Sequence, residues 1–479
     1  MAGLQRRTLL WALAALVLVA LLLAAIWGWR TVDELGRIGT ANKAKLYCSA
    51  VFVSGREPAS VLEAELAAPG LDRVTADLDF DGHRVSATML WSRADVIYRP
   101  GIGCTRLVDL EEEALRDQID LQQLPTAPDL TDEPWPRGDL LADQSGLDYD
   151  RNAVEAVVAR AFADPDPDHP VGTRAVAVVW RGHLISERYA PGFGMDVPLA
   201  GWSMTKSLTA ALFGLRVQDG ALDLMAPAPV AEWQQDDDPR AAITLDQLLR
   251  MSSGLAFSEV YELLQSDAVR MLFADGGADM AAFAAAMPLA AEPDTHWNYA
   301  SGTTNLLQRI LRESFPDLVA YHRYVRERLL YPLGMTRTVI APDEAGNLVG
   351  SSFGYGTARD WARLGLLHLQ RGQWHGRQLL PAAWVDYSIT PTAADPQGRY
   401  GAHWWLNAGP EDDPRARPWP QLPADAYRAS GFEGQYVMVV PSADLVVVRM
   451  GYTPDRDRFS MATLTRELID ALPVSVASD

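Results

Sequence analysis

The chain has 479 residues, of which 48% are hydrophobic and 22% are charged, a normal balance for one large globular domain with additions. Its formal net charge of −20 argues against nucleic acid or an anionic lipid surface as the partner. The two cysteines form no C-x-x-C motif, the eight histidines show no metal-ligand spacing, and no glycine-rich phosphate loop is present. We therefore expect neither a metal nor a cofactor.

An unbroken apolar run lies near the N-terminus, over residues 9–29, with Arg6 and Arg7 before it and Arg30 after it. A helix of this length spans roughly 31 Å, enough to cross the hydrocarbon core of a bilayer. A cleaved secretory signal is the alternative, but no A-x-A-like cleavage site follows the run. We expect an uncleaved single-pass anchor in the inner membrane, with residues 1–8 in the cytoplasm and the catalytic domain on the periplasmic side.

Residues 30–145 are expected to form a small strand-rich region followed by a linker. Residues 45–53 have a strand-like composition, and two further strand-like runs flank a turn at Asp81-Gly82, which is a good hairpin signal. This interpretation places Cys48 and Cys104 on adjacent strands. In an exported region a disulfide is then expected, and two unpaired buried thiols are the alternative.

The remaining residues, 146–479, begin and end with strand-like runs and have mostly helical patterns in between. Hairpin patterns cover residues 173–189 and 434–450, and the helical patterns fill residues 203–395. This order predicts an α+β domain in which one antiparallel sheet is built from both ends of the domain and packs against helices. Ser203 would lie at the seam between sheet and helices.

The segment with a chemical signature is Ser203-Met204-Thr205-Lys206, at the head of an apolar helical pattern. A step of three residues in a helix lets the Ser203 hydroxyl and the Lys206 amine approach each other. Lys206 is one of three lysines, and the other two, Lys43 and Lys45, lie just after the apolar run. Arginine cannot lose its proton at accessible pH, whereas a desolvated lysine can. Lys206 is therefore predicted to be the base that activates Ser203.

Two further motifs follow in order: Tyr299-Ala300-Ser301, and Ala429-Ser430-Gly431-Phe432 before a strand. With the first motif they make the chain resemble the serine β-lactamase and penicillin-binding-protein superfamily over about residues 150–475. The resemblance is nearest to class C β-lactamases, to esterases of that fold and to 6-aminohexanoate-dimer hydrolases. It implies a β-lactamase-like fold with a helical subdomain.

The resemblance also implies a role for each matching residue. Ser203 would be acylated, Lys206 would remove its proton, and Tyr299 would be a phenolate or a proton shuttle toward the leaving group. A phenol is a poor base until a nearby cation lowers its pKa, which Lys206 is expected to do. The backbone N–H groups of Ser203 and Phe432 would form the oxyanion hole.

Departures from the family pattern bear on the substrate. Ser301 stands where an asparagine amide would grip a side-chain carbonyl, and Ala429 stands where a cation would attract a β-lactam carboxylate. Both favour the 6-aminohexanoate-dimer hydrolase and esterase branch, although Arg428 could still supply a cation. The expected substrate-binding residues are Ser301, Ser430, Gly431 and Phe432.

The sequence therefore predicts a membrane-anchored serine hydrolase of a small amide or ester substrate. One alternative is a β-lactamase or D,D-peptidase, and another is a catalytically silent sensor of acyl or peptidoglycan fragments. A third is a Ser-His-Asp hydrolase that uses Ser203 with His296, but Thr205 stands where the second glycine of a nucleophile elbow belongs. The oligomeric state and the physiological substrate are left open.

Overall fold

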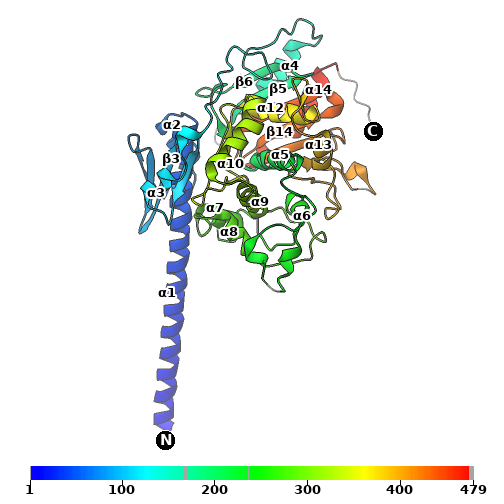
Figure 1. Cartoon of the computed structure of the whole chain (residues 1–479). Helices are drawn as coiled ribbons and strands as arrows, with labels where there is room; N and C mark the ends of the chain where they lie inside the picture. Colours follow the sequence, from blue (N-terminus) through cyan, green and yellow to red (C-terminus); the bar gives the residue numbers. More distant parts are fainter. Residues whose placement is uncertain are drawn as a thin grey trace.

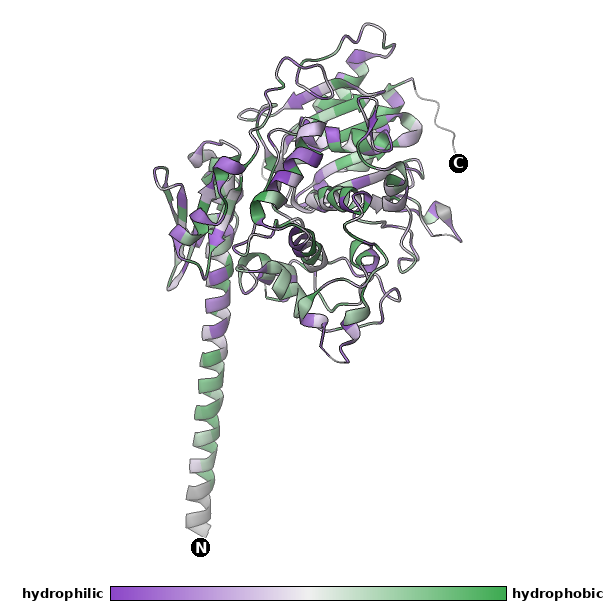
Figure 2. Cartoon of the chain, viewed as in Figure 1, coloured by the Kyte–Doolittle hydropathy of each residue, from purple (hydrophilic) through white to green (hydrophobic). Residues whose placement is uncertain are grey.

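A computed structural model describes residues 2–164, 166, 170–235, 237–262, 264–410 and 412–473. Helix α1 (Ala2–Cys48) projects from the body of the protein as a single rod (Figure 1). Its projecting part carries exposed apolar side chains, among them Trp11 at 76% and Leu16 at 68%, and Figure 2 shows this stretch as hydrophobic. By length and composition, the helix can cross a membrane. Residues 474–479 of the predicted domain 146–479 lie outside the described residues.

The expectation of a strand over residues 45–53 is wrong. Helix α1 runs to Cys48 and continues directly into a π-helical turn, η1 (Ser49–Val53). The buried apolar residues from position 44 to position 51 are Ala44, Tyr47, Cys48 and Val51, which recur at the spacing of one helix face. Packing of that face against a sheet outweighs the strand propensity of the individual residues.

The end of α1 lies across a four-stranded antiparallel sheet in the order β1-β2-β3-β4. Val85 pairs with Val96 and Ala87 with Ala94, and all four side chains are buried beneath the helix. A bond between Cys48 and Cys104 joins the end of α1 to β4, so the two cysteines lie on a helix and a strand rather than on two strands. The strands are β1 (Thr75–Asp79), β2 (Arg84–Met89), β3 (Ser92–Arg99) and β4 (Gly103–Leu107).

The larger domain is built on a six-stranded antiparallel sheet in the order β12-β13-β14-β15-β5-β6. Its central strands are almost wholly apolar because helices cover both faces. Alternate residues of β5 face α5 and α12 on one side and α4 and α14 on the other. The strands are β5 (Thr173–Trp180), β6 (His183–Tyr189), β12 (Trp405–Leu406), β13 (Tyr427–Gly431), β14 (Gln435–Val440) and β15 (Leu445–Gly451). The helices are α4 (Arg151–Arg160), α5 (Thr205–Gln218), α12 (Ala358–Leu369) and α14 (Met461–Ala471).

The helical excursion between β6 and β12 packs against the α5 side of the sheet, and a small three-stranded sheet in the order β7-β9-β8 adjoins it. Its longest helix other than α5 and α12 is α9, which packs on α5, α6 and α8. Its elements are α6 (Leu245–Leu249), α7 (Asp267–Phe273), α8 (Met280–Ala285), α9 (Ser301–Glu313), α10 (Leu318–Tyr324), α11 (Tyr331–Leu333), α13 (Ala382–Ser388), β7 (Leu199–Ala200), β8 (Val339–Ile340) and β9 (Gly354–Gly356). The excursion also contains the short strands β10 (Gln373–Trp374) and β11 (Arg377–Gln378), and the N-terminal region contains the short helices α2 (Pro58–Glu63) and α3 (Glu112–Asp117).

The N-terminal region and the larger domain share one apolar core, because α1 packs against α7. Arg37 of α1 pairs with Asp275 at 3.0 Å at the edge of this contact. Deeper in, the Lys45 amine donates a hydrogen bond to the Cys104 carbonyl and lies 4.3 Å from the ring centroid of Phe353. The two regions therefore form one packed unit.

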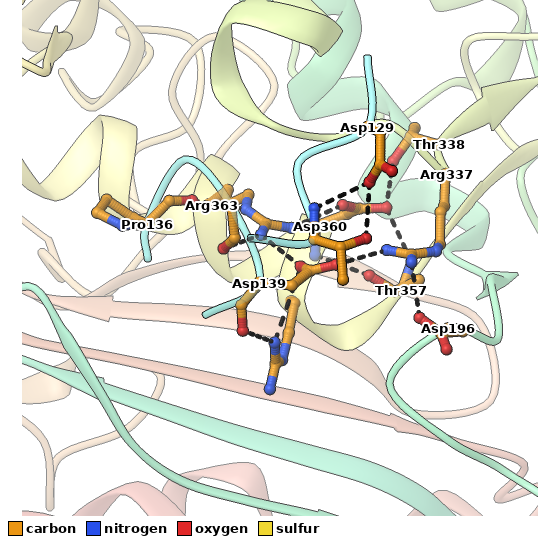
Figure 3. Close-up of polar contacts among 12 residues, drawn as sticks. Asp129, Pro136, Asp139, Asp196, Arg337, Thr338, Thr357, Asp360 and Arg363 are labelled. Atoms are coloured by element: carbon orange, nitrogen blue, oxygen red, sulfur yellow. Dashed lines mark hydrogen bonds and ion pairs between the residues drawn. The ribbon is translucent and has the colours of Figure 1, made fainter. Parts of the chain in front are cut away.

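The segment that connects them is fastened to α12 by buried charges (Figure 3). Arg363, which is 1% exposed, pairs with Asp139 at 3.0 Å and with Asp360 at 3.1 Å. Its guanidinium also donates to the Pro136 carbonyl at 2.7 Å, and Arg337 pairs with Asp139 from the other side at 3.0 Å. Burial opposes ionisation of Asp139, but the hydrogen bonds from Arg337 and Arg363 outweigh it and lower the pKa of this carboxyl group.

Replacing Asp139 with alanine is expected to reduce the free energy of unfolding by about 2–3 kcal/mol, because the buried Arg363 then loses one of its two carboxylate partners and keeps only Asp360. Denaturant and thermal unfolding of the detergent-solubilised protein measure the loss. Since the folded-state pKa of Asp139 is lowered, its contribution is present above the unfolded-state pKa and is lost as the pH falls through the folded-state value. Asp386→Ala breaks an exposed pair with Arg371 and should cost no more than about 1 kcal/mol. Equal losses in the two variants would contradict the role given to Asp139.

Candidate functional site

The predicted Ser203 and Lys206 pair is brought together at the start of α5. Ser203 lies in a 3₁₀ turn, η5 (Trp202–Met204), that leads directly into the helix. Lys206 is 1% exposed, and its amine lies 3.1 Å from Ser203 Oγ, 3.0 Å from Ser301 Oγ and 3.1 Å from the Ser351 carbonyl oxygen. Burial lowers the pKa of Lys206 to about 8, against the opposing effect of the Glu259 carboxylate. A lysine with this pKa is partly neutral near neutral pH, and a neutral amine has a lone pair that can accept the Ser203 proton.

Two backbone features next to Ser203 are unusual. Trp202 has φ of +48°, a left-handed conformation that is uncommon for a bulky residue and clusters at functional sites. The Thr205 hydroxyl holds this turn by donating to the Trp202 carbonyl at 2.7 Å. Gly431, at the end of β13, is a glycine for a steric reason, since a Cβ there would lie 2.1 Å from the Gly201 carbonyl oxygen. The end of β13 is therefore in direct contact with the turn that carries Ser203.

Tyr299 lies just before α9, with its ring beside Lys206. The Lys206 amine is 4.8 Å from the ring centroid. Burial raises the pKa of Tyr299 well above its ordinary value, and Tyr400 and Glu259 add to this effect, whereas a hydrogen bond with Ser203 opposes it. The expectation that Lys206 lowers this pKa is wrong, because desolvation of the phenolate dominates. Tyr299 is held as a neutral phenol, which can donate or pass on a proton but is not a standing base.

Glu259 is a site residue that the sequence analysis missed. The Ser301 hydroxyl donates to Glu259 Oε1 at 2.6 Å, and the Ser301 backbone N–H donates to Oε2 at 2.7 Å. With the bond from Lys206 to Ser301, this makes a chain of contacts from Lys206 through Ser301 to Glu259. The sequence signal was weak, because Glu259 lies in a loop without regular structure and matches none of the three motifs.

Ser203 opens into a cavity of about 150 Å³ with mostly apolar walls. Four side chains of α7 and the ring of Phe432 form much of the lining, and Tyr261 packs on Phe432 with ring centroids 5.1 Å apart. Among the described residues, the charged side chain on this lining is Glu259, and no arginine or lysine lies on it. The lining residues are Asn42, Trp202, Ser203, Glu259, Tyr261, Ala268, Val269, Leu272, Phe273, Ser301, Ser352 and Phe432.

Of the four expected substrate-binding residues, Ser301 and Phe432 line this cavity, whereas Ser430 and Gly431 lie behind it on β13. Arg428, the alternative cation, is on the same strand but stacks on the indole of Trp419, 3.8 Å from the ring centroid. It is therefore not placed to meet a substrate carboxylate at Ser203.

The histidines are used elsewhere. His296 is exposed and borders a different surface depression, next to Gly254 and Asn298. The buried His403 has both ring nitrogens engaged, with the Leu249 carbonyl at 2.7 Å and with Thr304 Oγ1 at 3.0 Å. Within the described part of the chain, no group of three or more His, Cys, Asp or Glu side chains is arranged to hold a metal ion. The geometry thus places a lysine, and not a histidine, beside Ser203.

The Beta-lactamase family model matches residues 151–469, so the chain belongs to the β-lactamase family. A curated relative, the 6-aminohexanoate-dimer hydrolase of Paenarthrobacter ureafaciens, is 25% identical over 312 residues, covering 60% of this chain and 74% of the relative. Two solved structures share the fold. One is a Bacillus anthracis protein assigned as a 6-aminohexanoate-dimer hydrolase, with a TM-score of 0.53 and 21% identity over 74% of this chain and 90% of that one. The other is a family VIII carboxylesterase, with a TM-score of 0.51 and 16% identity over 68% of this chain and 98% of that one.

Replacing Lys206 with arginine tests whether the amine acts as a base. Arginine keeps the positive charge but removes any accessible deprotonated form, so kcat/KM for a simple ester should fall by about 10² to 10⁴ while the protein still folds. In the wild type, kcat/KM should rise with pH through an apparent pKa near 8, where Lys206 loses its proton. Lys43→Arg, at a lysine that donates to the Leu71 carbonyl and does not line the cavity around Ser203, is the control and should keep its turnover. Near-normal turnover of Lys206→Arg with an unchanged pH profile would rule out the base.

Proposed function

We propose that the protein is a membrane-anchored serine hydrolase that cleaves an amide or ester bond through an acyl-serine intermediate. The observation that carries this proposal is the buried Lys206 amine, which lies within hydrogen-bond distance of Ser203 Oγ and has a pKa lowered to about 8. Membership of the β-lactamase family and the relation to a 6-aminohexanoate-dimer hydrolase support it. The fold shared with a carboxylesterase is consistent with ester cleavage as well.

In the proposed acylation step, Ser203 Oγ attacks the substrate carbonyl carbon while its proton passes to the neutral Lys206 amine. The backbone N–H groups of Ser203 and Phe432 stabilise the oxyanion that forms. When this tetrahedral intermediate collapses, the bond to the leaving nitrogen or oxygen breaks, and that atom takes a proton through the Tyr299 phenol, which is resupplied from Lys206. Water then attacks the acyl-serine by the reverse proton path and releases the acid.

Ser301 and Glu259 would position the base rather than react. Ser301 bridges the Lys206 amine and the Glu259 carboxylate, so the amine is held toward Ser203 by a neighbour that is itself held at both its hydroxyl and its backbone N–H. The Glu259 carboxylate also favours the protonated amine, which opposes the effect of burial. The pKa of about 8 is the balance of these two influences.

The cavity favours an acyl group without a negative charge. Its walls are mostly apolar, its charged side chain is the Glu259 carboxylate, and Arg428 is engaged with Trp419. A β-lactam carries a carboxylate that would meet no arginine or lysine on this lining and would be repelled by Glu259. Neutral esters and linear amides are therefore the preferred substrates of the proposed enzyme.

This preference gives a direct test. Short-chain p-nitrophenyl esters or linear amides should be turned over with a kcat/KM at least about tenfold above that for a chromogenic cephalosporin. A fluorophosphonate should label Ser203, and Ser203→Ala should lose both labelling and turnover. The reverse ranking would favour β-lactamase activity over esterase or amidase activity. The absence of both labelling and turnover would favour a catalytically silent sensor.

We further propose that residues 9–29 span the inner membrane, with residues 1–8 in the cytoplasm and the chain beyond residue 30 in the periplasm. The length and apolar surface of α1 support the span, and the bonded Cys48 and Cys104 suit an oxidising compartment. Protease added to spheroplasts should then digest the chain beyond residue 30. The two cysteines should resist alkylation until a reductant is added, in contrast to a Cys104→Ser control in which Cys48 reacts once the protein is unfolded. Free thiols in the native protein, or protection from protease, would contradict this topology.

A further inference from the structure

The cavity around Ser203 has one wall from outside the β-lactamase family region. Asn42 of α1 lines it together with Ser203 and Ser301. The family match begins at residue 151, so this wall belongs to the helix that leads from the apolar N-terminal segment. Asn42 reaches the cavity because α1 packs on α7, whose side chains form the neighbouring wall.

A second cavity of about 170 Å³ adjoins the first, between the N-terminal region and the larger domain. Asn42, Trp202 and Phe432 line both cavities, so the two meet at Asn42. Its lining is mainly apolar and includes Leu46 of α1 and Leu199 of β7. The second cavity therefore lies beyond Asn42, Trp202 and Phe432 as seen from Ser203.

The Asn42 carboxamide oxygen is buried and has no hydrogen-bond partner among the described residues. An acceptor buried without a partner is costly, and such groups are rare in folded proteins. Nearby donors on α1 are already engaged, since Lys43 donates to the Leu71 carbonyl and Lys45 to the Cys104 carbonyl. The Asn42 oxygen is thus left free at the junction of the two cavities.

The charges of the second cavity indicate what kind of donor fits. Arg56 and Arg174 both pair with Glu65, the latter at 2.6 Å, so the cations there are engaged. Glu65 Oε2 is a second buried acceptor without a partner among the described residues. A third such atom on this lining is Ser49 Oγ, which can accept as well as donate. All three free atoms can therefore accept, which favours a ligand that offers hydrogen-bond donors. A neutral amide N–H supplies such a donor at a much lower desolvation cost than an ammonium group.

We propose that Asn42 is a specificity-determining residue whose carboxamide oxygen accepts a hydrogen bond from an acylamino N–H of the substrate, and that α1 thereby completes the substrate site. This inference rests on the proposed acyl-serine function. The substrate class is an ester or amide whose acyl part carries a secondary amide, with the apolar remainder in the second cavity.

The test compares pairs of substrates that differ only in the N–H group. The p-nitrophenyl esters of N-acetylglycine and N-acetyl-β-alanine are each paired with the analogue in which oxygen replaces that N–H, and kcat and KM are measured on the full-length protein in detergent. For at least one pair, the wild type should prefer the N–H substrate by about tenfold, through KM more than kcat. Asn42→Ala should lose that preference while keeping its kcat/KM for the oxygen analogue. Asn42→Asp, which keeps an acceptor, should retain the preference.

Controls separate this inference from the function on which it rests. Asn152→Ala, at an exposed asparagine of α4, should behave as wild type. Fluorophosphonate labelling of Ser203 reports whether each variant has an assembled site. If the proteins are labelled but the wild type shows no N–H preference, the role of Asn42 alone is overturned. The same holds if labelled Asn42→Ala keeps the preference. If Asn42→Ala is not labelled, loss of the preference in Asn42→Asp would also overturn it. A wild type that is neither labelled nor active would overturn both proposals.

Discussion

The site depends on an amine that is held out of water against three oxygen atoms. The Lys206 amine contacts the hydroxyls of Ser203 and Ser301 and the carbonyl of Ser351, which come from three separate parts of the chain. These hydrogen bonds make burial of the lysine tolerable, and the same burial lowers its pKa toward the range in which a base is useful. Any change that moves α5, α9 or the segment before β9 relative to the others would alter both effects together. The helices and the central sheet thus serve to hold three oxygens around one nitrogen.

Local spacing made part of this site predictable. Ser203 and Lys206 are three residues apart at the start of one helix, and Tyr299 and Ser301 are two apart at the start of another, so each pair was visible as a short motif. Glu259 and Asn42 were not, because each reaches the site through tertiary packing rather than through a position in a motif. The pKa of Tyr299 was also misjudged, since the extent of its burial depends on neighbours such as Tyr400 that lie far away in the sequence.

The same distinction applies to the fold. The hairpins of residues 173–189 and 434–450 were recognisable because an apolar strand, a turn and a second apolar strand follow each other directly, and strands β5, β6, β14 and β15 lie there. Residues 45–53 were misassigned because their composition was given more weight than their periodicity. The buried apolar positions repeat at three and four residues, which indicates a helix lying on a surface, but the surface itself comes from strands 30 to 60 residues later. Burial against a distant element decided the conformation, and composition alone contains no information about that element.

Helix α1 runs without a break from the exposed apolar segment to Asn42. The thirteen steps along the helix from Trp29 to Asn42 correspond to about 20 Å. Each residue added or removed between them would shift the site by about 1.5 Å and turn it about the helix axis by about 100°. With α1 anchored as proposed, a continuous helix rather than a flexible linker connects the membrane span to the catalytic domain. Its cavity would then lie at a fixed height above the bilayer and in a fixed orientation relative to the transmembrane helix. Distance from the membrane as well as chemistry would then select its substrates, because molecules whose cleavable bond does not reach that height above the bilayer would not be cleaved.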